Sequence, residues 1–271
     1  MKTPITYYGG KQSMLRYILP RIPIHRIFVE PFVGGGAVFW AKEKSEVEVV
    51  NDTNKEVINF YTVAQKKCNA LEKEIKATLH SREQFKRAKV VYENHDMFSD
   101  VQRAWALWVL SCQSYSAALG SGWRYGRSKK VETLIDKKRK QFTYHIKKRL
   151  EHTQIECNDA LKVIKSRDSK DTFFYCDPPY FNANMGHYAG YTLHDFICLL
   201  EALVHIKGKF LLSSYPSDIL SEYTNRYGWQ TFEVQRNLGM RKEGTRGKTE
   251  VLTANYDLSG VLPLAGYDWC C

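Results

Sequence analysis

The chain has 271 residues, 44% of them hydrophobic, so it can bury a sizeable core, and the composition favours a folded protein over an intrinsically disordered one. Its 40 Lys and Arg against 29 Asp and Glu give a net charge of +11, which favours a polyanionic partner such as nucleic acid. The seven cysteines form no C-x-x-C pair, which indicates no disulfide framework. Neither an apolar signal core nor a long apolar run occurs, so no membrane span is expected, and the sequence predicts a cytoplasmic protein, or a nuclear one in a eukaryote.

The first part of the chain predicts the start of an α/β fold. Residues 14–18 have the spacing of a short helix, and 26–30 is a short apolar run that predicts a buried strand. Residues 46–50 alternate like a second strand, and 54–65 carries a longer helical pattern.

The middle of the chain has a different character. From about residue 66 to residue 150 helical patterns and charged residues dominate, and a glycine-bounded loop at 122–126 is followed by a dense basic stretch. We therefore predict one domain formed by 1–65 and 151–271, which is split by a basic helical insertion over 66–150.

After residue 150 strands and helices alternate again. The expected strands are 153–157, 172–176, 210–213, 229–234 and 250–256, and the expected helices are 159–166, 192–206 and 216–227. Alternation of this kind implies an α/β fold with a doubly wound, mostly parallel sheet and helices on both faces.

The first predicted strand runs into the segment Glu-Pro-Phe-Val-Gly-Gly-Gly at 30–36. Glycines after a strand let backbone N–H groups approach a ligand at the carboxyl end of the sheet. A dinucleotide fingerprint fails because Phe39 takes its last glycine position, and a P-loop fails because Gln12 follows Gly10-Lys11. The segment therefore suits a nucleoside-type cofactor without a phosphate chain, although an ordinary strand-to-helix turn also explains it.

Two other features are weak by themselves. Asp52, at the end of the second predicted strand, can accept hydrogen bonds from both hydroxyls of a ribose, but Asp52 or Thr53 can equally cap the following helix. The cluster Tyr7–Lys11 has the composition of an N-terminal turn with a solvated lysine.

The most specific feature is Asp177-Pro178-Pro179-Tyr180, directly after the apolar strand 172–176. Two prolines fix φ and remove two N–H donors, so the backbone leaves the strand stiff. The Asp177 carboxylate and the Pro178 carbonyl can together accept both hydrogens of an exocyclic amino group, and the ring of Tyr180 offers a stacking surface for a base. The alternative is a rigid turn that only ends a strand.

In this order the motifs resemble the Dam family of adenine-N6 DNA methyltransferases, which belongs to the D12 class and to the α group in motif order. The likeness extends from about residue 4 to residue 256. The segments similar to family motifs are 7–11 (W-A-G-G-K in the family), 30–36 (E-P-F-x-G-x-G), 51–54 (D-x-N), 159–160, 177–180 (D-P-P-Y), 211–214 and 244–250.

The resemblance implies the fold of S-adenosylmethionine-dependent methyltransferases, with the last strand antiparallel, and S-adenosylmethionine as the cofactor. It implies that Asp52 holds the ribose and that Asp159 contacts the adenine side of the cofactor. The catalytic residues implied are Asp177, Pro178, Pro179 and Tyr180. The cofactor-binding residues implied are Tyr7, Lys11, Pro31, Phe32, Gly34, Gly36, Asp52, Asp159 and Asp177. Tyr7 departs from the usual tryptophan but keeps an aromatic wall.

Double-stranded DNA is the expected partner of the basic insertion, which would hold phosphates and present side chains to the grooves. The residues expected to contact DNA are Tyr115, Arg124, Tyr125, Arg127, Lys129, Lys130, Lys138, Arg139, Arg246 and Lys248. For each single cation the alternative is that it lies on a solvated helix face and contacts no DNA.

The hairpin with which the family reads GATC is not evident. No metal motif occurs, so no metal is expected. We expect a monomer, and the resemblance leaves a cognate restriction endonuclease open.

The predicted function is methyl transfer from S-adenosylmethionine to N6 of a flipped-out adenine within a specific sequence of double-stranded DNA. Cytosine N4, RNA or a protein glutamine stay open as acceptors, and so does a non-catalytic DNA-binding protein. Asp rather than Asn at 177 and the basic insertion favour DNA, and the intact D-P-P-Y segment argues against a loss of activity. A dehydrogenase is disfavoured by the failed glycine fingerprint.

Overall fold

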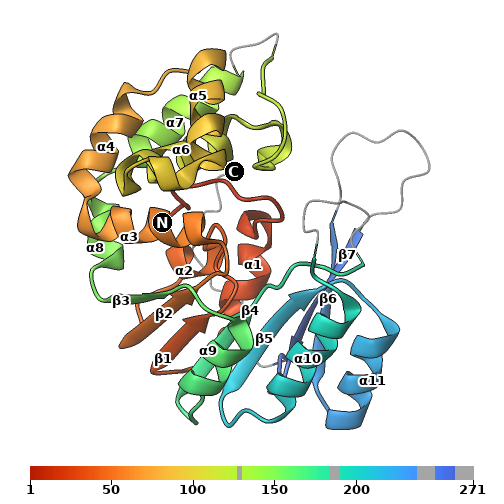
Figure 1. Ribbon diagram of the computed structural model, residues 1–271. Coiled ribbons are helices and arrows are strands. Elements are labelled where there is room, and N and C mark those ends of the chain that lie inside the picture. The colour runs from red at the N-terminus through yellow and green to blue at the C-terminus, as the bar shows by residue number, and fades with distance from the viewer. Residues whose placement is uncertain (127–129, 183–189, 237–247, 260–271) are drawn as a thin grey trace, which may run out of the picture. The chain divides into compact units, whose positions relative to one another are not determined.

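The computed structural model describes residues 1–126, 130–182, 190–236 and 248–259 (Figure 1). The chain divides into two compact units. The first unit comprises Met1–Gln12, Val33–Lys42 and Val50–Asn158, and the second comprises Ser13–Phe32, Glu43–Val49 and Asp159–Cys271. The predicted division into a catalytic domain over 1–65 and 151–271 and a DNA-recognition insertion over 66–150 stays a prediction.

The second unit contains the parallel part of a β-sheet. Strand β1 (Ile27–Glu30) pairs in parallel with β4 (Thr172–Cys176), and β4 pairs in parallel with β5 (Lys209–Ser214). Strand β7 (Lys248–Ala254) is antiparallel to both β5 and β6 (Gln230–Arg236). The prediction of a mostly parallel sheet with an antiparallel last strand is confirmed.

With β2 (Val47–Asn51) and β3 (Thr153–Glu156), the described strands form a seven-stranded sheet in the order β3-β2-β1-β4-β5-β7-β6. The direction of winding reverses between β1 and β4. Ligands of doubly wound sheets bind outside the carboxyl ends of the strands at such a reversal, so the segments that follow β1 and β4 are placed for function.

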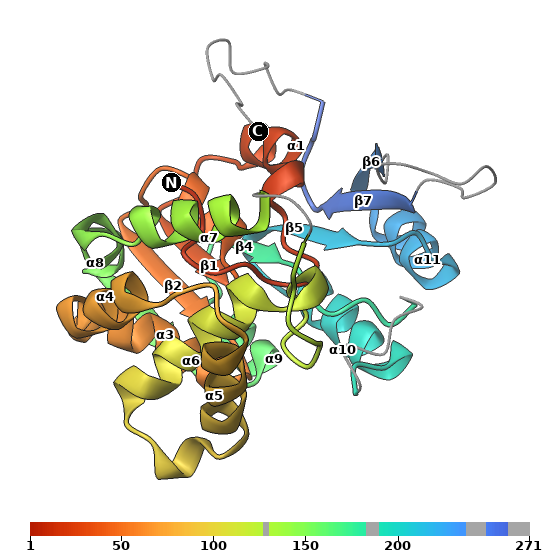
Figure 2. The same ribbon diagram turned by 90° about the horizontal axis from the view of Figure 1, so that it is seen from above.

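Helices cover both faces of the sheet in the second unit. Helices α9 (Ala160–Arg167), α10 (Leu193–Val204) and α11 (Asp218–Tyr227) lie along one face, and α1 (Leu15–Ile18) lies on the other (Figures 1 and 2). The α9–α11 side buries an apolar core, and fully burying one large apolar side chain stabilises a fold by about 1.5–3 kcal/mol. Fully buried members of this core include Phe174, Leu200 and Leu212.

The first unit is mainly helical. Its longer helices are α3 (Lys55–Lys66), α4 (Cys68–Ala77), α5 (Arg82–Glu93), α6 (Asp100–Gln113) and α7 (Lys130–Gln141), and its shorter ones are α2 (Ala37–Ala41) and α8 (Tyr144–Leu150). Helix α6 is buried from Ala104 to Gln113, as expected of a helix that is apolar on nearly all sides and packs at the centre of its unit.

Short 3-10 turns connect several of these elements, namely η1 (Gln12–Met14), η2 (Leu19–Arg21), η3 (His95–Met97) and η4 (Tyr115–Ala117). In the part of the chain that the structure describes, the helices are too short or too polar to span a lipid bilayer.

Gly36 occupies a position that rejects a side chain. Its φ of 64° is left-handed, and a Cβ there would lie 2.8 Å from the Tyr61 hydroxyl and 3.2 Å from the Trp40 ring. We expect Gly36→Ala to lower the free energy of unfolding by about 1–3 kcal/mol through backbone strain and overpacking. Denaturant unfolding measures this. Gly120→Ala is the matched control because a Cβ there meets nothing within 4 Å, and equal losses in both variants would contradict the expectation.

Candidate active site

Four strands of the second unit bring polar side chains to one edge of the sheet. Glu30 ends β1, Asp177 follows β4, and Ser213 lies next to the end of β5. These three strands are parallel, so their carboxyl ends share an edge. Strand β7 runs the opposite way and pairs Val251 with Ser214, so Glu250 reaches the same edge from its own amino end. Glu30, Ser213 and Glu250 are buried.

The Asp177–Tyr180 turn is held by hydrogen bonds at this edge. The hydroxyl of Tyr180 lies 2.9 Å from Glu250 Oε1, 3.2 Å from Ser213 Oγ and 3.4 Å from Asp177 Oδ1. Ser213 donates to Glu250 Oε1 at 3.1 Å. The turn predicted to carry the chemistry is therefore fixed through its tyrosine to two further strands.

Tyr180 is half-buried rather than sealed in the core. Its ring meets the ring of Tyr215 edge-on, with centroids 4.5 Å apart. Burial raises the pKa of Tyr180 well above its usual value, and the charges of Asp177 and Glu250 raise it further, so the hydroxyl stays protonated. Asp177 is also half-buried, whereas Pro178 is buried. An aromatic ring, a partly exposed carboxylate and a stiff backbone thus lie together at one turn.

In the first unit, the glycine loop packs against aromatic side chains. Gly34 has a φ of 43°, and a Cβ there would lie 2.9 Å from the ring of Tyr7. Tyr61 donates from its hydroxyl to the Gly34 carbonyl at 3.0 Å. Only glycine permits this close approach, so the structure brings together Tyr7 and Gly34, two of the predicted cofactor residues.

Asp52 ties this loop to the start of α3. Its Oδ2 accepts from the Gly34 N–H at 2.9 Å, and its Oδ1 accepts from the Asn54 N–H at 2.8 Å. Burial raises the pKa of Asp52, although these backbone hydrogen bonds oppose the shift. The alternative that Asp52 or Thr53 caps α3 is wrong, because Asn54 is the N-cap and accepts from the Glu56 N–H.

The other predicted cofactor residues occupy several settings. Lys11 is buried in the first unit and donates to the Gly9 carbonyl at 3.0 Å. In the second unit Pro31 is buried, and Phe32 packs against the apolar core. Asp159 is exposed and caps α9 by accepting from the Lys162 N–H at 3.1 Å.

The chain matches known proteins over most of its length. A family model described as "D12 class N6 adenine-specific DNA methyltransferase" matches residues 7–237. The chain belongs to this family. It is 28% identical to the type II methyltransferase M1.LlaDCHI of Lactococcus lactis subsp. cremoris, over 92% of this chain and 93% of that protein. It is 24% identical to the DNA adenine methylase of Escherichia coli strain K12, over 96% of each chain, and 25% identical to the DNA N-6-adenine-methyltransferase of Escherichia phage P1, over 94% of this chain and 34% of that protein.

Three residues of this D12 methyltransferase that are predicted to contact DNA, Tyr115, Arg124 and Tyr125, lie in or beside one loop of the first unit. Ser114 and Trp123 form an isolated antiparallel bridge that closes the loop. Tyr115 and Tyr125 are 67% and 70% exposed, so both rings are accessible. Arg124 instead donates through Nη2 to the Cys112 carbonyl at 2.7 Å, which commits part of its guanidinium to holding the loop.

Two predicted DNA contacts on α7 are engaged within the first unit. Lys138 donates to the Thr3 carbonyl at 2.6 Å, and burial lowers its pKa. Arg139 donates to the Thr78 carbonyl at 2.7 Å and pairs with Asp136. Predicted contacts that lie outside the described residues are Arg127, Lys129 and Arg246, and the side chains of Lys130 and Lys248.

The sequence did not identify three of the supporting groups. Ser213 and Glu250 lie in apolar strands, and Tyr61 lies in an amphipathic helix, so local pattern gave no reason to place them beside the predicted motifs. The available signals were the likeness of 211–214 and 244–250 to family motifs and the carboxylate of Glu250 at the start of the predicted strand 250–256, since a buried charge needs hydrogen-bond partners.

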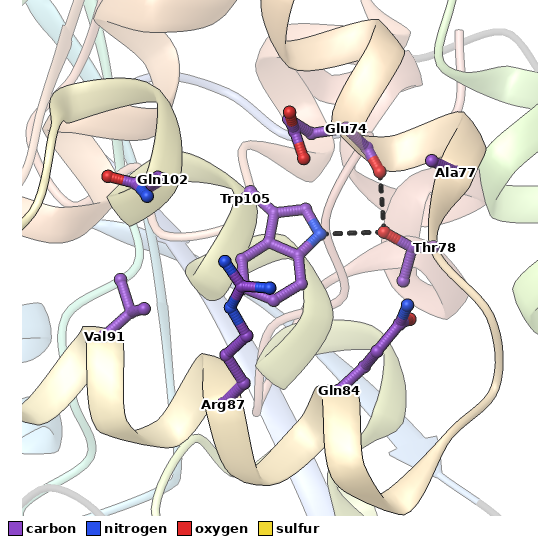
Figure 3. A pocket seen from close by; sticks show the side chains of 8 residues that line it. All are labelled: Glu74, Ala77, Thr78, Gln84, Arg87, Val91, Gln102 and Trp105. Carbon is purple, nitrogen blue, oxygen red and sulfur yellow. Dashed lines mark hydrogen bonds between the residues drawn. The ribbon is translucent and has the colours of Figure 1, made fainter.

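A cavity of about 170 Å³ lies among α4, α5 and α6, and none of the predicted site residues lines it (Figure 3). Trp105 donates to the Thr78 hydroxyl at 2.8 Å, and Thr78 donates to the Glu74 carbonyl at 2.7 Å. These polar groups are thus satisfied within the protein, and the cavity is a gap between packed helices.

Proposed function

We propose that this chain transfers the methyl group of S-adenosylmethionine to N6 of an adenine that is flipped out of double-stranded DNA. The observation that carries the proposal is the Asp177–Tyr180 turn at the carboxyl end of β4, with a half-buried carboxylate beside an aromatic ring. The family fixes the reaction as adenine-N6 methylation of DNA. What we propose beyond this is that S-adenosylmethionine is the methyl donor, that the adenine is flipped out of the duplex, and that the named residues have the roles given below.

The glycine loop and Asp52 fit the nucleoside part of S-adenosylmethionine, which supplies an activated sulfonium methyl group. The backbone N–H groups of Gly34, Asn54 and Thr53 already donate to the Asp52 carboxylate, and its remaining acceptor capacity is proposed to take a ribose hydroxyl. The ring of Tyr7 lies against the loop and offers an aromatic wall. Donors to a phosphate chain are not needed for this ligand.

Asp177 and Pro178 suit the acceptor side of the reaction. The lone pair of an adenine N6 amine is delocalised into the ring, which makes the amine a poor nucleophile. If the Asp177 carboxylate and the Pro178 carbonyl accept its two hydrogens, the pair localises on nitrogen. The same oxygens stabilise positive charge that develops there in the transition state. Flipping costs a few kcal/mol, and stacking on Tyr180 offsets part of it.

Exposed cations of the first unit are proposed to hold the DNA phosphates. Lys137 and Lys140 are exposed on α7, whereas Lys138 between them is hydrogen-bonded to the Thr3 carbonyl. The logarithm of the DNA-binding constant falls linearly with the logarithm of the salt concentration, and each phosphate contact contributes about 0.9 to the steepness of that line. We expect the double variant Lys137→Gln/Lys140→Gln to make the line less steep by about 1–2. Fluorescence anisotropy with a labelled duplex measures it.

Lys138→Gln is the matched control for this test. It should leave the salt slope unchanged and instead lower the free energy of unfolding by about 1–2 kcal/mol, through loss of a charged donor to a backbone carbonyl. A smaller slope in the Lys138 variant, with no change in the double variant, would contradict this assignment. It would show that Lys138 contacts a DNA phosphate and that Lys137 and Lys140 do not.

The test of the function is a methylation assay with labelled S-adenosylmethionine and four acceptors: duplex DNA, single-stranded DNA, RNA and a protein mixture. Nucleoside mass spectrometry then identifies the product. The proposal requires N6-methyladenine in the duplex, and N4-methylcytosine, labelled RNA or labelled protein would each replace it. Sequencing of DNA from expressing cells gives the recognised sequence. Several relatives are named type II methyltransferases, so we propose a cognate restriction endonuclease as the partner to seek, and a monomer in solution.

A further inference from the structure

An aromatic stack in the first unit ends in an exposed ring. Trp123 contacts the ring of His80, with centroids 4.7 Å apart and planes at 35°, and the ring of Tyr125, with centroids 6.0 Å apart and planes at 24°. Planes this close to parallel indicate stacking rather than edge-on contact. His80 and Trp123 are half-buried, whereas Tyr125 is 70% exposed. The stack is therefore anchored in the unit through two of its rings and open to solvent at the third.

Hydrogen bonds hold the stack in place. Trp123 donates from Nε1 to Gln113 Oε1 at 3.1 Å, and the Arg124 N–H donates to the Gln113 carbonyl at 2.7 Å. The Arg124 carbonyl in turn accepts from His80 Nε2 at 2.9 Å. A ring that is fixed before binding loses little conformational entropy when a ligand stacks on it. The geometry thus suits a preformed binding surface.

Arg82 adds a positive charge beside this stack. It is exposed, and its guanidinium carbon lies 4.7 Å from the Trp123 ring centroid and 5.7 Å from that of Tyr125. A group across the outer face of Tyr125 would lie farther from Trp123 than Tyr125 itself does, at 6.0 Å, and the guanidinium lies nearer. Arg82 therefore leaves the outer face of the Tyr125 ring uncovered.

Packing explains Trp123 but not Tyr125. Trp123 is half-buried and its N–H is hydrogen-bonded, whereas Tyr125 keeps most of its ring in water and so adds little to apolar burial. Aromatic rings beside cations are the surfaces on which bases stack in proteins that bind single-stranded nucleic acid. The chain belongs to a family of DNA methyltransferases, so a base of DNA is the ligand that fits this surface.

We propose that Tyr125, supported by Trp123 and flanked by Arg82, is a stacking site for an unpaired base of DNA. The base lies on the outer face of the Tyr125 ring, and Arg82 contacts a neighbouring phosphate. Bases inside a duplex are stacked on both faces, so the site selects DNA in which a base has left the stack, and base flipping produces such DNA. The inference goes beyond the proposed function and uses neither Asp52 nor Asp177.

Fluorescence anisotropy without a cofactor tests the site with two labelled probes, a single-stranded thymine homopolymer and a long blunt duplex of G·C pairs. Neither probe contains adenine, so the test does not depend on the target base. We expect Tyr125→Leu to weaken binding of the homopolymer by about 5- to 150-fold, the effect of losing one base–aromatic stack. Its affinity for the duplex should stay within about twofold of the wild type, because paired bases offer the ring no free face.

Two conservative variants separate the ring from the rest of the side chain. Tyr125→Phe and Tyr125→Trp keep an aromatic face and should bind the homopolymer within about threefold of the wild type. Tyr125→Ala serves in place of Tyr125→Leu should the leucine variant not fold. Because Tyr125 is mostly exposed, we expect the thermal unfolding midpoint of either variant to stay close to that of the wild type.

The salt dependence of homopolymer binding separates stacking from charge. Tyr125→Leu should leave the steepness of the line of log binding constant against log salt concentration unchanged, because the ring contacts no phosphate. Arg82→Gln should make that line less steep by about 0.7, the contribution of one phosphate contact on a single strand. A line that becomes less steep in Tyr125→Leu, or that stays as steep in Arg82→Gln, would contradict the assigned roles.

Tyr144→Leu is the matched control. Tyr144 is a 56% exposed tyrosine of the same unit with Lys147 Nζ 5.8 Å from its ring centroid, and its loss should leave both affinities unchanged. The proposal is overturned if the wild type does not bind the homopolymer, if Tyr125→Leu binds it as tightly as the wild type, or if Tyr125→Phe loses as much affinity as Tyr125→Leu. Failure of the proposed function looks different, because the wild-type protein then forms no N6-methyladenine while these binding results still hold.

Discussion

Asp177→Ala is expected to lower the rate of DNA methylation by about two orders of magnitude or more, comparable with removal of one preorganised polar group from an active site. The variant loses the carboxylate that would accept an N6 hydrogen and that would lie next to positive charge developing on nitrogen. The measurement is single-turnover methylation with saturating S-adenosylmethionine, which isolates the transfer step from product release.

Two control variants test whether the loss of rate comes from the Asp177 carboxylate itself. Asp177→Asn keeps an acceptor oxygen but no charge, so it should retain more activity than the alanine variant. Asp171→Ala removes an exposed aspartate before the other end of β4 and should keep the wild-type rate. Near-normal turnover in Asp177→Ala would show that the Asp177 carboxylate does not accept a hydrogen of the target amine. The proposal that a flipped-out adenine binds at this turn would then lose its main support.

Asp52→Ala is expected to weaken binding of S-adenosylmethionine by about 10- to 100-fold, because hydrogen bonds to a charged group contribute about 1.5–3 kcal/mol. The variant loses the proposed acceptor of the ribose hydroxyls. It also leaves the Gly34 and Asn54 N–H groups without their carboxylate, so the loop itself loosens. Calorimetry measures the affinity. Asp52→Asn retains an acceptor and should fall between the alanine variant and the wild type.

The affinity should also depend on pH in a defined direction. Burial raises the pKa of Asp52 above the ordinary value of 3.8, so its carboxylate takes up a proton at a higher pH than an exposed aspartate does. Protonation removes acceptor capacity, so binding weakens as the pH falls, starting above 3.8. Asp52→Asn should abolish this dependence. If the affinity for S-adenosylmethionine falls equally in the wild type and in Asp52→Asn as the pH is lowered, a group other than Asp52 causes the effect.

The sequence by itself determined the α/β class, most of the elements and the family. Strands β1, β4 and β5 were predictable because buried parallel strands are continuous apolar runs, and such runs are visible without any tertiary contact. The segments at 30–36 and 177–180 were recognisable because glycine and proline impose backbone constraints that are local.

The tertiary structure decided which polar groups work together. The turn with Asp177 and Tyr180 lies far in sequence from both Ser213 and Glu250, and only strand order and register bring them to one edge. The partners of a cation are likewise decided by the tertiary structure. Lys138 counts toward a basic stretch in the sequence, and in the structure its ammonium group donates to a backbone carbonyl 135 residues away. Local pattern records what a residue can do, whereas its partners depend on contacts between segments far apart in sequence.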